Sequence, residues 1–600
     1  MERLEGLAIA GRATVGPIPV PVPALIESRS SPGGGAGLSL TALPSPPGFR
    51  HLRLAEEDRA FDLRVPVLAP EVAPAGPTVH PIGESAWMVH APARPEELAR
   101  LRDARPELVV LGNARTLYSE GEPLVETVLH LRSAVGAEPL LWGPRVALPH
   151  RVPLLTYLGF DLLDTTEVGM AVARGQRPDA TFGPVEETGR VSDEIVAAEF
   201  SRAMSETRFA LRTGRLRELV ESRLTAEPAM AELLRHADRQ LAGLLDQRSP
   251  VAFEGTRSYV LAESHRRPEM RRFRGRLIER YRPPASKTVL LLVPCSKTKP
   301  YRQSRSHRRF ASALEGLPGL ERVHLVSVSS PIGLVPRELE DLPPARHYDI
   351  PVTGEWTESE RQYVEDALDH LRRAGQYRRA VVHLDPVEYG FLRAGLEAAL
   401  PVSWTLSDGR TTSGAALDSL RRAVREALAD AVPVPGGPLA VVREELQELA
   451  SVQFGRAAAE RLFAAPVRLA GRPWFQRITD GRTDLATVRE ERGLFHLTIA
   501  GARRLAPEFP LAVQVDPTLT LEGDLFVPGV HAADPRIRVG DSVVLLRNGA
   551  LAGVGEAALP GPLMTELRRG TAVRVRHREH GPTDTAKMGE RGRPSDGPVV

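Results

Sequence analysis

Short apolar runs alternate with helix-like stretches through the first 250 residues. The runs ELVVLGN (107–113), PLLWGP (within 139–145) and GFDLLDTT (159–166) are typical of buried strands. A helix-like stretch, PLVETVLHLRSAV (123–135), separates the first two runs. This alternation predicts a parallel β/α architecture for residues 1–250, in the form of a degenerate (β/α) barrel-like domain.

Two further stretches of this first region have a distinct character. Residues 31–50, SPGGGAGLSLTALPSPPGFR, are predicted to be a loop because they are rich in glycine, serine and proline. Residues 201–245 form a long helical run that closes the region.

A second region, 266–432, has the pattern of an open parallel sheet covered by helices on both faces. Its strands are predicted at 288–294, 322–330, 379–385 and 402–406, and its helices at 358–375 and 415–430. It opens with a basic helix within 266–284, whose arginines either contact a phosphate backbone or form an ordinary solvated face.

Chemically active residue types follow the strands of this second region. Cys295 comes directly after the first strand, the segment SSPIGLVPRELE (329–340) follows the second, and DPVEYG (385–390) follows the third. In open α/β sheets, functional residues gather at the carboxyl ends of the strands. We therefore expect these three segments to lie together.

The use of lysine and cysteine singles out the first of these segments. Only four lysines occur among 600 residues, and three of them, Lys287, Lys297 and Lys299, lie within thirteen residues together with the only cysteine, Cys295. Arginine cannot replace lysine where a compact, titratable ammonium is needed. Lys297 and Lys299 are therefore interpreted as chemically required.

The remaining chain divides into a linker domain at 436–506, a small β-barrel at 507–580 and a disordered tail at 581–600.

The N-terminus lacks the basic start and uninterrupted apolar run of a secretory signal, and no apolar run is long enough to span a membrane. A cytoplasmic protein with no membrane contact is therefore expected. One cysteine excludes an intramolecular disulfide and a cysteine-rich zinc site, and no metal or other cofactor is predicted.

The segment GDLFVPGVHAADPRIRVGDSVVLLRNGALAGVGEA (523–557) resembles the PUA domain, a small RNA-binding barrel. The resemblance implies binding to structured RNA. It places the RNA contacts at Gly529, Arg538, Gly540 and Asp541.

The segment PCSKTKPYRQSRSH (294–307) resembles the archaeosine synthase family, which is related to archaeal tRNA-guanine transglycosylase. It carries the pattern P-C, three residues, K-P-Y, two residues, S, two residues, H. Supporting matches are SSPIGLVPREL (329–339), YDIPVTGEW (348–356), VVLGNARTL (109–117) and LLTYLGFDLLDTT (154–166), so that the resemblance covers almost the whole chain.

The resemblance implies a transferase acting on tRNA that carries 7-cyano-7-deazaguanine (preQ0) in the D-arm. Members of the family attach free lysine to the nitrile, and a partner radical SAM enzyme then cleaves the adduct to archaeosine. Addition of an amine to a nitrile releases no leaving group, so ATP is not required.

Two mechanisms fit these residues. In one, Cys295 attacks the nitrile as a thiolate, Lys297 or Lys299 lowers its pKa, and His307 moves protons. In the other, the amine attacks directly and Cys295 only shapes the pocket. The predicted catalytic residues are Cys295, Lys299 and His307, and the predicted substrate-binding residues are Ser296, Lys297, Tyr301, Ser304, Arg337 and Glu338.

Ordinary structural roles compete with these assignments. Cys295 also suits a buried apolar position, Ser304 suits a helix cap, and Arg337 and Glu338 suit a mutual ion pair. Two other functions stay open, a transglycosylase that inserts preQ0 and a catalytically inactive tRNA-binding scaffold for a partner enzyme. Active transglycosylases hold zinc with three cysteines and a histidine, which a chain with one cysteine cannot supply.

Overall fold

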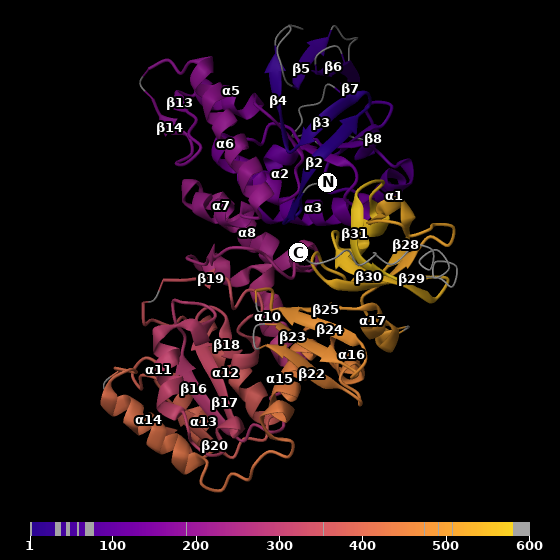
Figure 1. Ribbon diagram of the computed structural model, residues 1–600. Helices are drawn as coiled ribbons and strands as arrows, with labels where there is room; N and C mark the ends of the chain where they lie inside the picture. The colour runs from indigo at the N-terminus through magenta and orange to yellow at the C-terminus, as the bar shows by residue number, and fades with distance from the viewer. Residues whose placement is uncertain are drawn as a thin grey trace, which may run out of the picture.

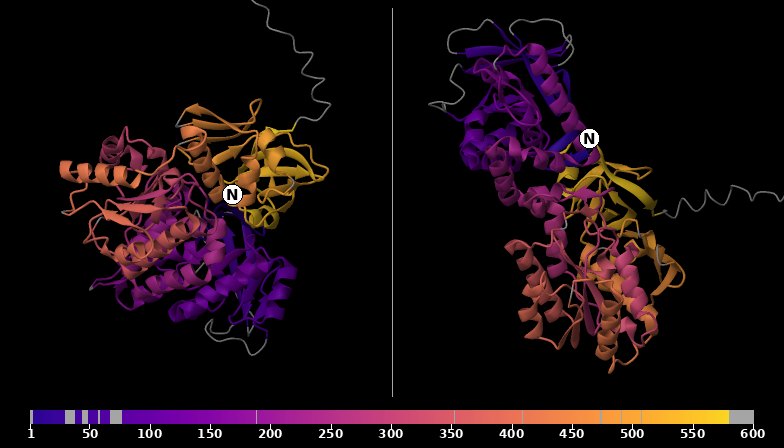
Figure 2. Two further views of the ribbon diagram at one scale, coloured as in Figure 1. Left: turned by 90° about the horizontal axis from the view of Figure 1, so that it is seen from below. Right: turned by 90° about the vertical axis from the view of Figure 1, so that its left-hand side faces the viewer.

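The computed structural model of the protein describes residues 3–29, 38–43, 49–56, 59–66, 77–187, 189–351, 353–407, 409–472, 475–489, 491–506 and 508–579 (Figure 1). The N-terminal domain lies at one end of the molecule and the central α/β unit at the other, and the two C-terminal units lie along one side between them (Figures 1 and 2). The predicted disordered tail, 581–600, and Lys587 lie outside the described residues.

The N-terminal domain is built on a nine-stranded sheet with the order β7-β6-β5-β4-β12-β11-β10-β9-β8. Its five central strands are parallel neighbours: β4 (Ala24–Arg29), β12 (Leu162–Asp164), β11 (Leu140–Gly143), β10 (Leu108–Leu111) and β9 (Ala86–Val89). At the edges lie β5 (Ser39–Leu43), β6 (Phe49–Glu56), β7 (Arg59–Pro66) and β8 (Val79–Pro81), and a separate small sheet contains β1 (Arg3–Glu5), β2 (Ala8–Val15) and β3 (Ile18–Val22).

Helices connect the parallel strands as the sequence predicts. They are α1 (Pro95–Ala104), α2 (Ala114–Glu120), α3 (Glu122–Val135) and α4 (Val152–Tyr157), and α5 (Thr166–Ala173) follows β12. The parallel β/α alternation is confirmed, and the described strands form an open sheet with β7 and β8 at its edges.

The prediction of a loop throughout residues 31–50 is wrong in part. Ser39–Leu43 forms β5, which pairs with β4 and β6, and Phe49 begins β6. The apolar and threonine positions within Ser39–Leu43 favour strand pairing, which outweighs the composition of the surrounding segment. Residues 30–37 and 44–48 lie outside the described residues.

The predicted helical run of residues 201–245 consists of four helices. They are α6 (Asp193–Thr213), α7 (Leu216–Arg223), α8 (Pro228–Gln240) and α9 (Ala242–Arg248). Gly214 ends α6 in the left-handed conformation with φ 70°, and Pro228 occupies the first position of α8, where proline is favoured.

A buried network of charged side chains joins these helices to the next one, α10 (Pro268–Glu279). The Arg217 guanidinium is almost fully buried and binds Asp238 of α8 with two nitrogens, and its Nε lies 2.9 Å from Glu221. Arg267, the residue that precedes α10, binds the same Glu221 with two nitrogens. The start of α10 is thereby fixed against α7 and α8.

The central α/β unit contains a five-stranded sheet with the order β18-β17-β16-β20-β21. Its strands are β16 (Val289–Pro294), β17 (Val323–Ser329), β18 (Gly333–Pro336), β20 (Arg379–Val382) and β21 (Val402–Trp404), of which only β18 is antiparallel to its neighbour. The helices of the unit are α11 (Arg305–Leu314), α12 (Glu358–Ala374), α13 (Arg393–Glu397) and α14 (Gly414–Ala427).

Both faces of this sheet are covered, as predicted. Leu291 of β16 packs with Phe310 of α11 and Leu420 of α14 on one face. Leu290 belongs to the core of the other face, together with Leu371 of α12. Because successive residues of a strand point to opposite faces, a strand covered on both sides has to be apolar throughout, as β16 is.

The last two units follow in order along the chain. The first contains α15 (Gly437–Phe454), α16 (Arg456–Leu462), a four-stranded sheet of β22 (Arg468–Arg472), β23 (Phe475–Thr479), β24 (Asp484–Arg489) and β25 (Phe495–Leu497), and α17 (Ile499–Leu505). The second contains β26 (Ala512–Val515), β27 (Leu525–Phe526), β28 (Val530–Ala533), β29 (Ser542–Arg547), β30 (Ala550–Ala557), α18 (Gly561–Glu566) and β31 (Thr571–Arg578). Its six strands, in the order β27-β31-β30-β29-β26-β28, form the small barrel-like sheet that the sequence predicts.

Within the described part of the chain, no helix combines the length and apolar character that crossing a membrane demands.

The variant Arg217→Met tests the buried network. It leaves Asp238 and Glu221 with buried negative charge that has lost a partner, and we expect it to lower the free energy of unfolding by about 3–5 kcal/mol. Guanidinium denaturation measures the change. The control is Arg239→Met in α8, whose exposed side chain pairs with Glu122 at the surface and contributes less than about 1 kcal/mol. Equal losses in both variants would contradict the assignment.

Candidate active site

Cys295 lies at the carboxyl end of β16, where it begins the loop that leads to α11. Its N–H donates to the carbonyl oxygen of Val328 in β17 at 3.1 Å, so the register of the two strands fixes its backbone. The side chain is half-buried. Ser296 beside it is half-buried and Lys297 is exposed.

A chain of hydroxyl groups leads away from the Cys295 thiol. Ser329, the last residue of β17, hydrogen-bonds the thiol and also the hydroxyl of Tyr348. Tyr348 in turn bonds the hydroxyl of Tyr301. Both tyrosine rings are fully buried, and burial raises the pKa of both phenols, which are therefore neutral.

Lys299 lies over the Tyr348 ring, with its Nζ atom 4.0 Å from the ring centroid. This is the geometry of a cation–π contact. Burial lowers the pKa of the Lys299 ammonium, while the negative charges of Cys295 and Asp349 act in the opposite direction. Lys299 therefore releases its proton more readily than an ordinary lysine.

The expected activation of Cys295 by a lysine is only partly present. Burial raises the pKa of the thiol, and the hydrogen bond from Ser329 and the charge of Lys299 lower it by less. Lys299 thus lowers the pKa of the thiol as predicted, but the net direction is upward because desolvation of the thiolate outweighs the nearby ammonium. Cys295 rests as a neutral thiol beside a lysine whose proton is loosely held.

Acidic and aromatic residues that the sequence analysis did not assign surround this pair. Glu388 disfavours the thiolate of Cys295, and Asp349 favours the ammonium of Lys299. Tyr389 is buried, and burial together with the charges of Cys295 and Glu388 raises the pKa of its phenol. Glu388 and Tyr389 belong to the segment 385–390, which was expected at this edge, but only the folded loop shows which of its side chains approach the thiol.

His307 lies in α11 with both ring nitrogens occupied. Nε2 is 3.0 Å from the carbonyl oxygen of Pro294, which can only accept, and Nδ1 is 3.0 Å from Nη2 of Arg337, which can only donate. Burial and the Arg337 charge lower the pKa of the imidazole to about 3. A neutral ring with no free nitrogen is suited to positioning the loop, and the predicted proton transfer by His307 stays a prediction.

The other motif residues support this arrangement. Ser304 caps α11 by accepting the N–H of His307 at 3.2 Å, and the Tyr301 ring stacks on the His307 ring at a centroid distance of 5.5 Å. Both are contacts within the protein. Their predicted binding of substrate stays a prediction.

Arg337 and Glu338 point to different clusters. Arg337 donates to Glu340 at 2.9 Å as well as to His307. Glu338 is buried, accepts the hydroxyl proton of Tyr281 at 2.6 Å and lies 3.4 Å from Nε2 of His324. These partners bring the pKa of Glu338 to about 2, although burial opposes the charge. Substrate binding by either residue stays a prediction, since both side chains are engaged within the protein.

The predicted RNA-binding residues lie at packed positions of the C-terminal sheet unit. Arg538 pairs with Asp246 of α9 at 2.9 Å, and the buried Asp541 accepts the N–H of Arg538 at 2.8 Å. Gly540 has φ 90° and stands where a side chain would approach Val251. At Gly529 a Cβ atom would lie 2.7 Å from Leu519. Contact of these residues with RNA stays a prediction.

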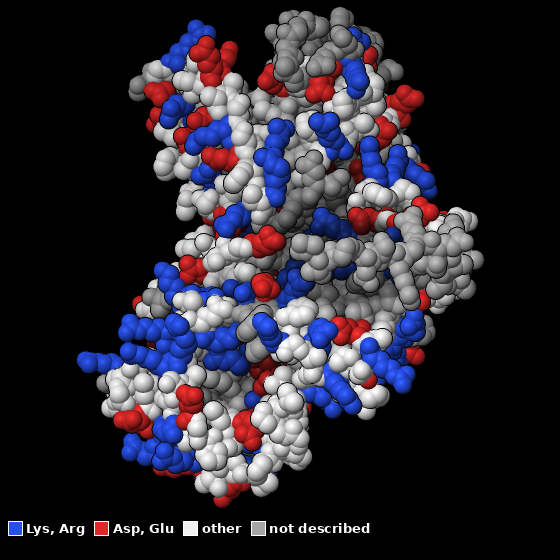
Figure 3. Space-filling view, viewed as in Figure 1, with Lys and Arg blue, Asp and Glu red and all other residues white. Residues whose placement is uncertain are grey.

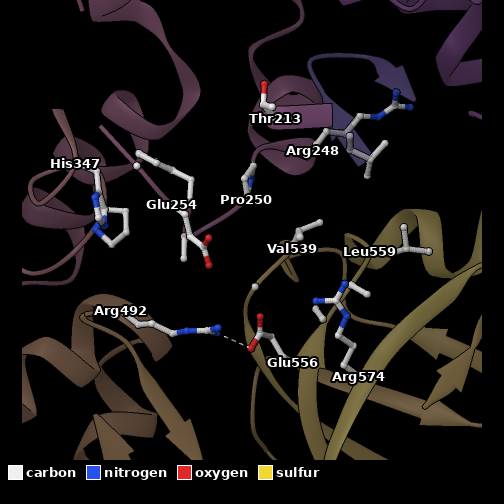
Figure 4. Close-up of a pocket in the computed structure, with 18 of the residues that line it drawn as sticks. Thr213, Arg248, Pro250, Glu254, His347, Arg492, Val539, Glu556, Leu559 and Arg574 are labelled. Carbon is white, nitrogen blue, oxygen red and sulfur yellow. Dashed lines mark hydrogen bonds and ion pairs between the residues drawn. The ribbon is translucent and has the colours of Figure 1, made fainter. Parts of the chain in front are cut away.

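A large cavity of about 730 Å³ lies between the units (Figure 4). Its lining includes Arg248, His347 and Arg574, and Arg492 pairs with Glu556 across it at 3.0 Å. The short strand β19 (Tyr348–Asp349), which pairs with β15 (Arg257–Ser258), separates this cavity from the Cys295 cluster. His347 lines the cavity, while Tyr348 bonds Ser329 on the Cys295 side.

Basic side chains gather on the flank where the α/β unit faces the N-terminal domain, near β18, β19 and α11 (Figure 3). Arg305 and Arg308 of α11 are exposed there. Within the described ranges, no group of three or more His, Cys, Asp and Glu side chains has the arrangement of a metal site.

Three family models match the chain. Residues 270–424 match a model described as Domain of unknown function (DUF5591), residues 444–511 match the Patch-forming domain C2 of tRNA-guanine transglycosylase, and residues 518–578 match the PUA domain. The last match confirms the predicted resemblance of the C-terminal barrel.

Similar proteins cover most of the chain. The chain is 31% identical over 510 residues to the archaeosine synthase of Haloferax volcanii, covering 80% of this chain and 83% of that protein. It is 31% identical over 511 residues to archaeosine synthase subunit alpha of Methanosarcina acetivorans, covering 79% and 80%. A solved structure of a protein of unknown function matches with a TM-score of 0.39 and 26% identity, covering 51% of this chain and 98% of that one.

Alkylation of the single cysteine tests the charge balance at Cys295. Because only the thiolate reacts, the iodoacetamide rate is expected to rise with pH about a midpoint above 9.0, the value of an ordinary thiol. Lys299→Met removes the ammonium that favours the thiolate and should move this midpoint further upward. Mass spectrometry measures the rates, and Lys297→Met is the control because its exposed side chain should leave the midpoint unchanged. A lower midpoint in Lys299→Met would contradict this arrangement.

His307→Gln tests the neutral histidine. Between pH 6.5 and about 3 the unfolded chain binds a proton at His307 that the folded protein does not bind. The stability contribution is therefore fully present above pH 6.5 and falls by roughly a few kcal/mol as the pH decreases through this window. Glutamine keeps a donor and an acceptor but does not titrate, so chemical denaturation should show a shallower pH dependence in the variant. Parallel curves would rule the neutral assignment out.

Proposed function

This chain belongs to the archaeosine synthase family, and we propose that it attaches lysine to the nitrile of preQ0 in tRNA, through a covalent intermediate on Cys295. The enzyme acts in archaeosine biosynthesis, and we expect it to meet its tRNA substrate in the cytoplasm. The observation that carries the catalytic proposal is the pairing of a single thiol, of raised pKa, with a lysine of lowered pKa at the end of β16.

The first step forms a thioimidate. The proton of the Cys295 thiol passes to Lys299, and the sulfur attacks the nitrile carbon. One bond of the C≡N group breaks as the C–S bond forms, and Lys299 returns the proton to the nitrile nitrogen. A thiol and an amine with opposed pKa shifts exchange a proton at little cost, which favours this route.

The second step transfers the imidoyl carbon to the substrate amine. The neutral ε-amine of free lysine attacks the thioimidate carbon, the C–S bond breaks, and the sulfur leaves as a thiolate. The proton lost by the amine returns to Cys295 through Lys299. The product is an amidine, and the atoms of preQ0 and lysine are all retained, so neither ATP nor a redox partner is consumed.

Two carboxylates support the choice of an amine as the second substrate. Glu388 and Asp349 act on Cys295 and Lys299 electrostatically, so an ammonium that enters beside the thiol finds negative charge there. Glu388 is in position to accept the proton that makes the incoming amine nucleophilic. Tyr389, a neutral phenol, donates a hydrogen bond to Glu388 and so helps to orient this carboxylate.

A partner protein is part of the proposal. The similar protein of Methanosarcina acetivorans is named as subunit alpha of archaeosine synthase, which implies a second subunit for that enzyme. We expect the corresponding partner of this chain to be the radical SAM enzyme that cleaves the lysine adduct to archaeosine.

Mass spectrometry of nucleosides tests the function. tRNA that carries preQ0 is incubated with the protein and ¹⁵N-labelled lysine, without ATP. We expect a labelled amidine adduct with the native protein and at least a hundredfold lower rate with Cys295→Ala. Ser312→Ala, which changes an exposed serine of α11, is the control and should keep the native rate. Without lysine, the Cys295 peptide should gain the mass of one preQ0 group.

Other outcomes distinguish the alternatives. An adduct formed equally well by Cys295→Ala would show direct attack by the amine and would remove the covalent step. Bound tRNA with no adduct from the native protein would favour an inactive scaffold. Incorporation of free preQ0 into unmodified tRNA would identify a transglycosylase.

A further inference from the structure

A second cavity has a volume of about 360 Å³, and seven of its fifteen lining residues are arginine. It lies where α9 and α10 meet the C-terminal sheet unit, at a distance in sequence and fold from the Cys295 cluster. Arg266, Arg271, Arg272, Arg276 and Arg280 come from the segment around α10. Arg536 and Arg538 come from the loop before β29.

The carboxylates of this cavity do not balance the arginines. Asp246 binds Arg272 at 2.8 Å and Arg538 at 2.9 Å. Asp238 is bound by Arg217 from the buried network. Glu279 is exposed at the rim, Asp534 pairs with Arg536, and the buried Asp541 attracts Arg276, but the seven arginines still outnumber these carboxylates.

Arg276 is the most distinctive of these residues. Its half-buried side chain lines the cavity, and it has no hydrogen bond or ion pair with any of the residues that the structure describes. Burial lowers the pKa of its guanidinium to about 9, the charges of Arg272 and Arg280 act in the same direction, and those of Asp541 and Asp246 oppose it. A guanidinium that is withdrawn from water and makes no hydrogen bond destabilises the folded protein, because a carboxylate beyond hydrogen-bond reach compensates it only in part, which indicates that its donors are kept for a ligand.

Arg272, one turn earlier on the same helix, differs from Arg276 because its guanidinium is fully engaged within the protein. Arg272 donates to Asp246 and to the carbonyl oxygens of Pro250 and Ser249 at 2.8–2.9 Å. The row Arg272, Arg276 and Arg280 is spaced four residues apart and therefore lies along one face of α10 and its end, with about 6 Å between successive positions. Gly275, which lacks a side chain, leaves the face open beside Arg276.

We propose that this cavity binds phosphate groups of the tRNA backbone, with Arg276 as the central contact. The ligand class rests on the tRNA substrate of the proposed function. A polymer fits better than a small free anion because the exposed Arg266 and Arg271 extend the positive surface from the cavity to the outside.

The same helix links this surface to the candidate active site. Arg274 on α10 donates to the carbonyl oxygen of Pro331, two residues after Ser329. The tRNA phosphates bound on one face of α10 are thus held by the same helix that contacts the loop beside Cys295. This arrangement fixes the distance between the bound phosphates of the tRNA and the base that reacts.

Fluorescently labelled, unmodified tRNA tests the proposal. For Arg276→Met we expect roughly tenfold weaker binding at moderate salt, with the slope of log K against log salt reduced by about one. The melting temperature should change little, because the Arg276 guanidinium has no hydrogen-bond partner among the described residues and the variant loses only its longer-range attraction to the buried Asp541. Arg272→Met should instead lower the melting temperature. Arg379→Met, which removes an exposed charge at the start of β20, controls for net charge and should bind normally.

Two results would overturn the proposal. One is unchanged tRNA affinity with a lowered melting temperature in Arg276→Met, which would make Arg276 structural. In the other, inorganic phosphate stabilises the native protein but not Arg276→Met, while the variant binds tRNA with unchanged affinity. That combination would make the cavity a site for small anions. Cys295→Ala separates the two proposals, because it should bind tRNA normally while forming no lysine adduct.

Discussion

The architecture depends on the buried ion network of Arg217, Glu221, Asp238 and Arg267. Buried charges are tolerated only when their partners are present, so this network allows one arrangement of α7, α8 and the start of α10. Everything that follows along the chain is placed relative to α10. One face of that helix reaches the loop beside the active edge through Arg274, and another meets the C-terminal sheet unit around Asp246 and Arg538.

At the active edge, burial and charge act against each other. Burial alone would keep Cys295 a thiol and make Lys299 a neutral amine, and the attraction between their charged forms opposes both shifts. As a result, the free energies of the neutral pair (thiol and amine) and of the charged pair (thiolate and ammonium) lie closer together than they would in water. Such a pair suits a reaction in which a proton leaves sulfur, reaches nitrogen and later returns. A permanently ionised thiolate would leave readily in the second half of that cycle, but it would carry no proton to pass to the nitrile nitrogen in the first half.

Much of this arrangement could be predicted from the sequence, because it depends on local pattern. The strand at 288–294 is apolar on both faces, Cys295 follows it, and the spacing of the motif predicts α11 with Ser304 as its cap. The contributions of Tyr348 and Glu388 could not be assigned, because they depend on how distant loops return to the strand ends.

Adjacent residues were the hardest to place. Arg337 and Glu338 lie in a tight 3₁₀ turn, Arg337–Leu339, and this turn sends one side chain toward His307 and the other toward His324. No periodicity in the sequence reports such a divergence. Composition was equally uninformative at Arg276, since its side chain makes no hydrogen bond with the described residues while Arg271, Arg272, Arg274 and Arg280 around it do, and they differ only in what folds against them.

The two-residue strand β19 carries a consequence for how this protein can change over evolutionary time. The backbone of β19 and the residue before it is held by β15, with the N–H of Arg257 bonded to the carbonyl of His347 and the N–H of Tyr259 bonded to that of Asp349. His347, just before the strand, lines the large cavity, whereas the next side chain, Tyr348, bonds Ser329 beside the thiol. A substitution that reshapes the cavity by shifting β19 also moves the Tyr348 hydroxyl. The two surfaces therefore cannot diversify independently, and lineages that alter one are expected to carry compensating changes in the other.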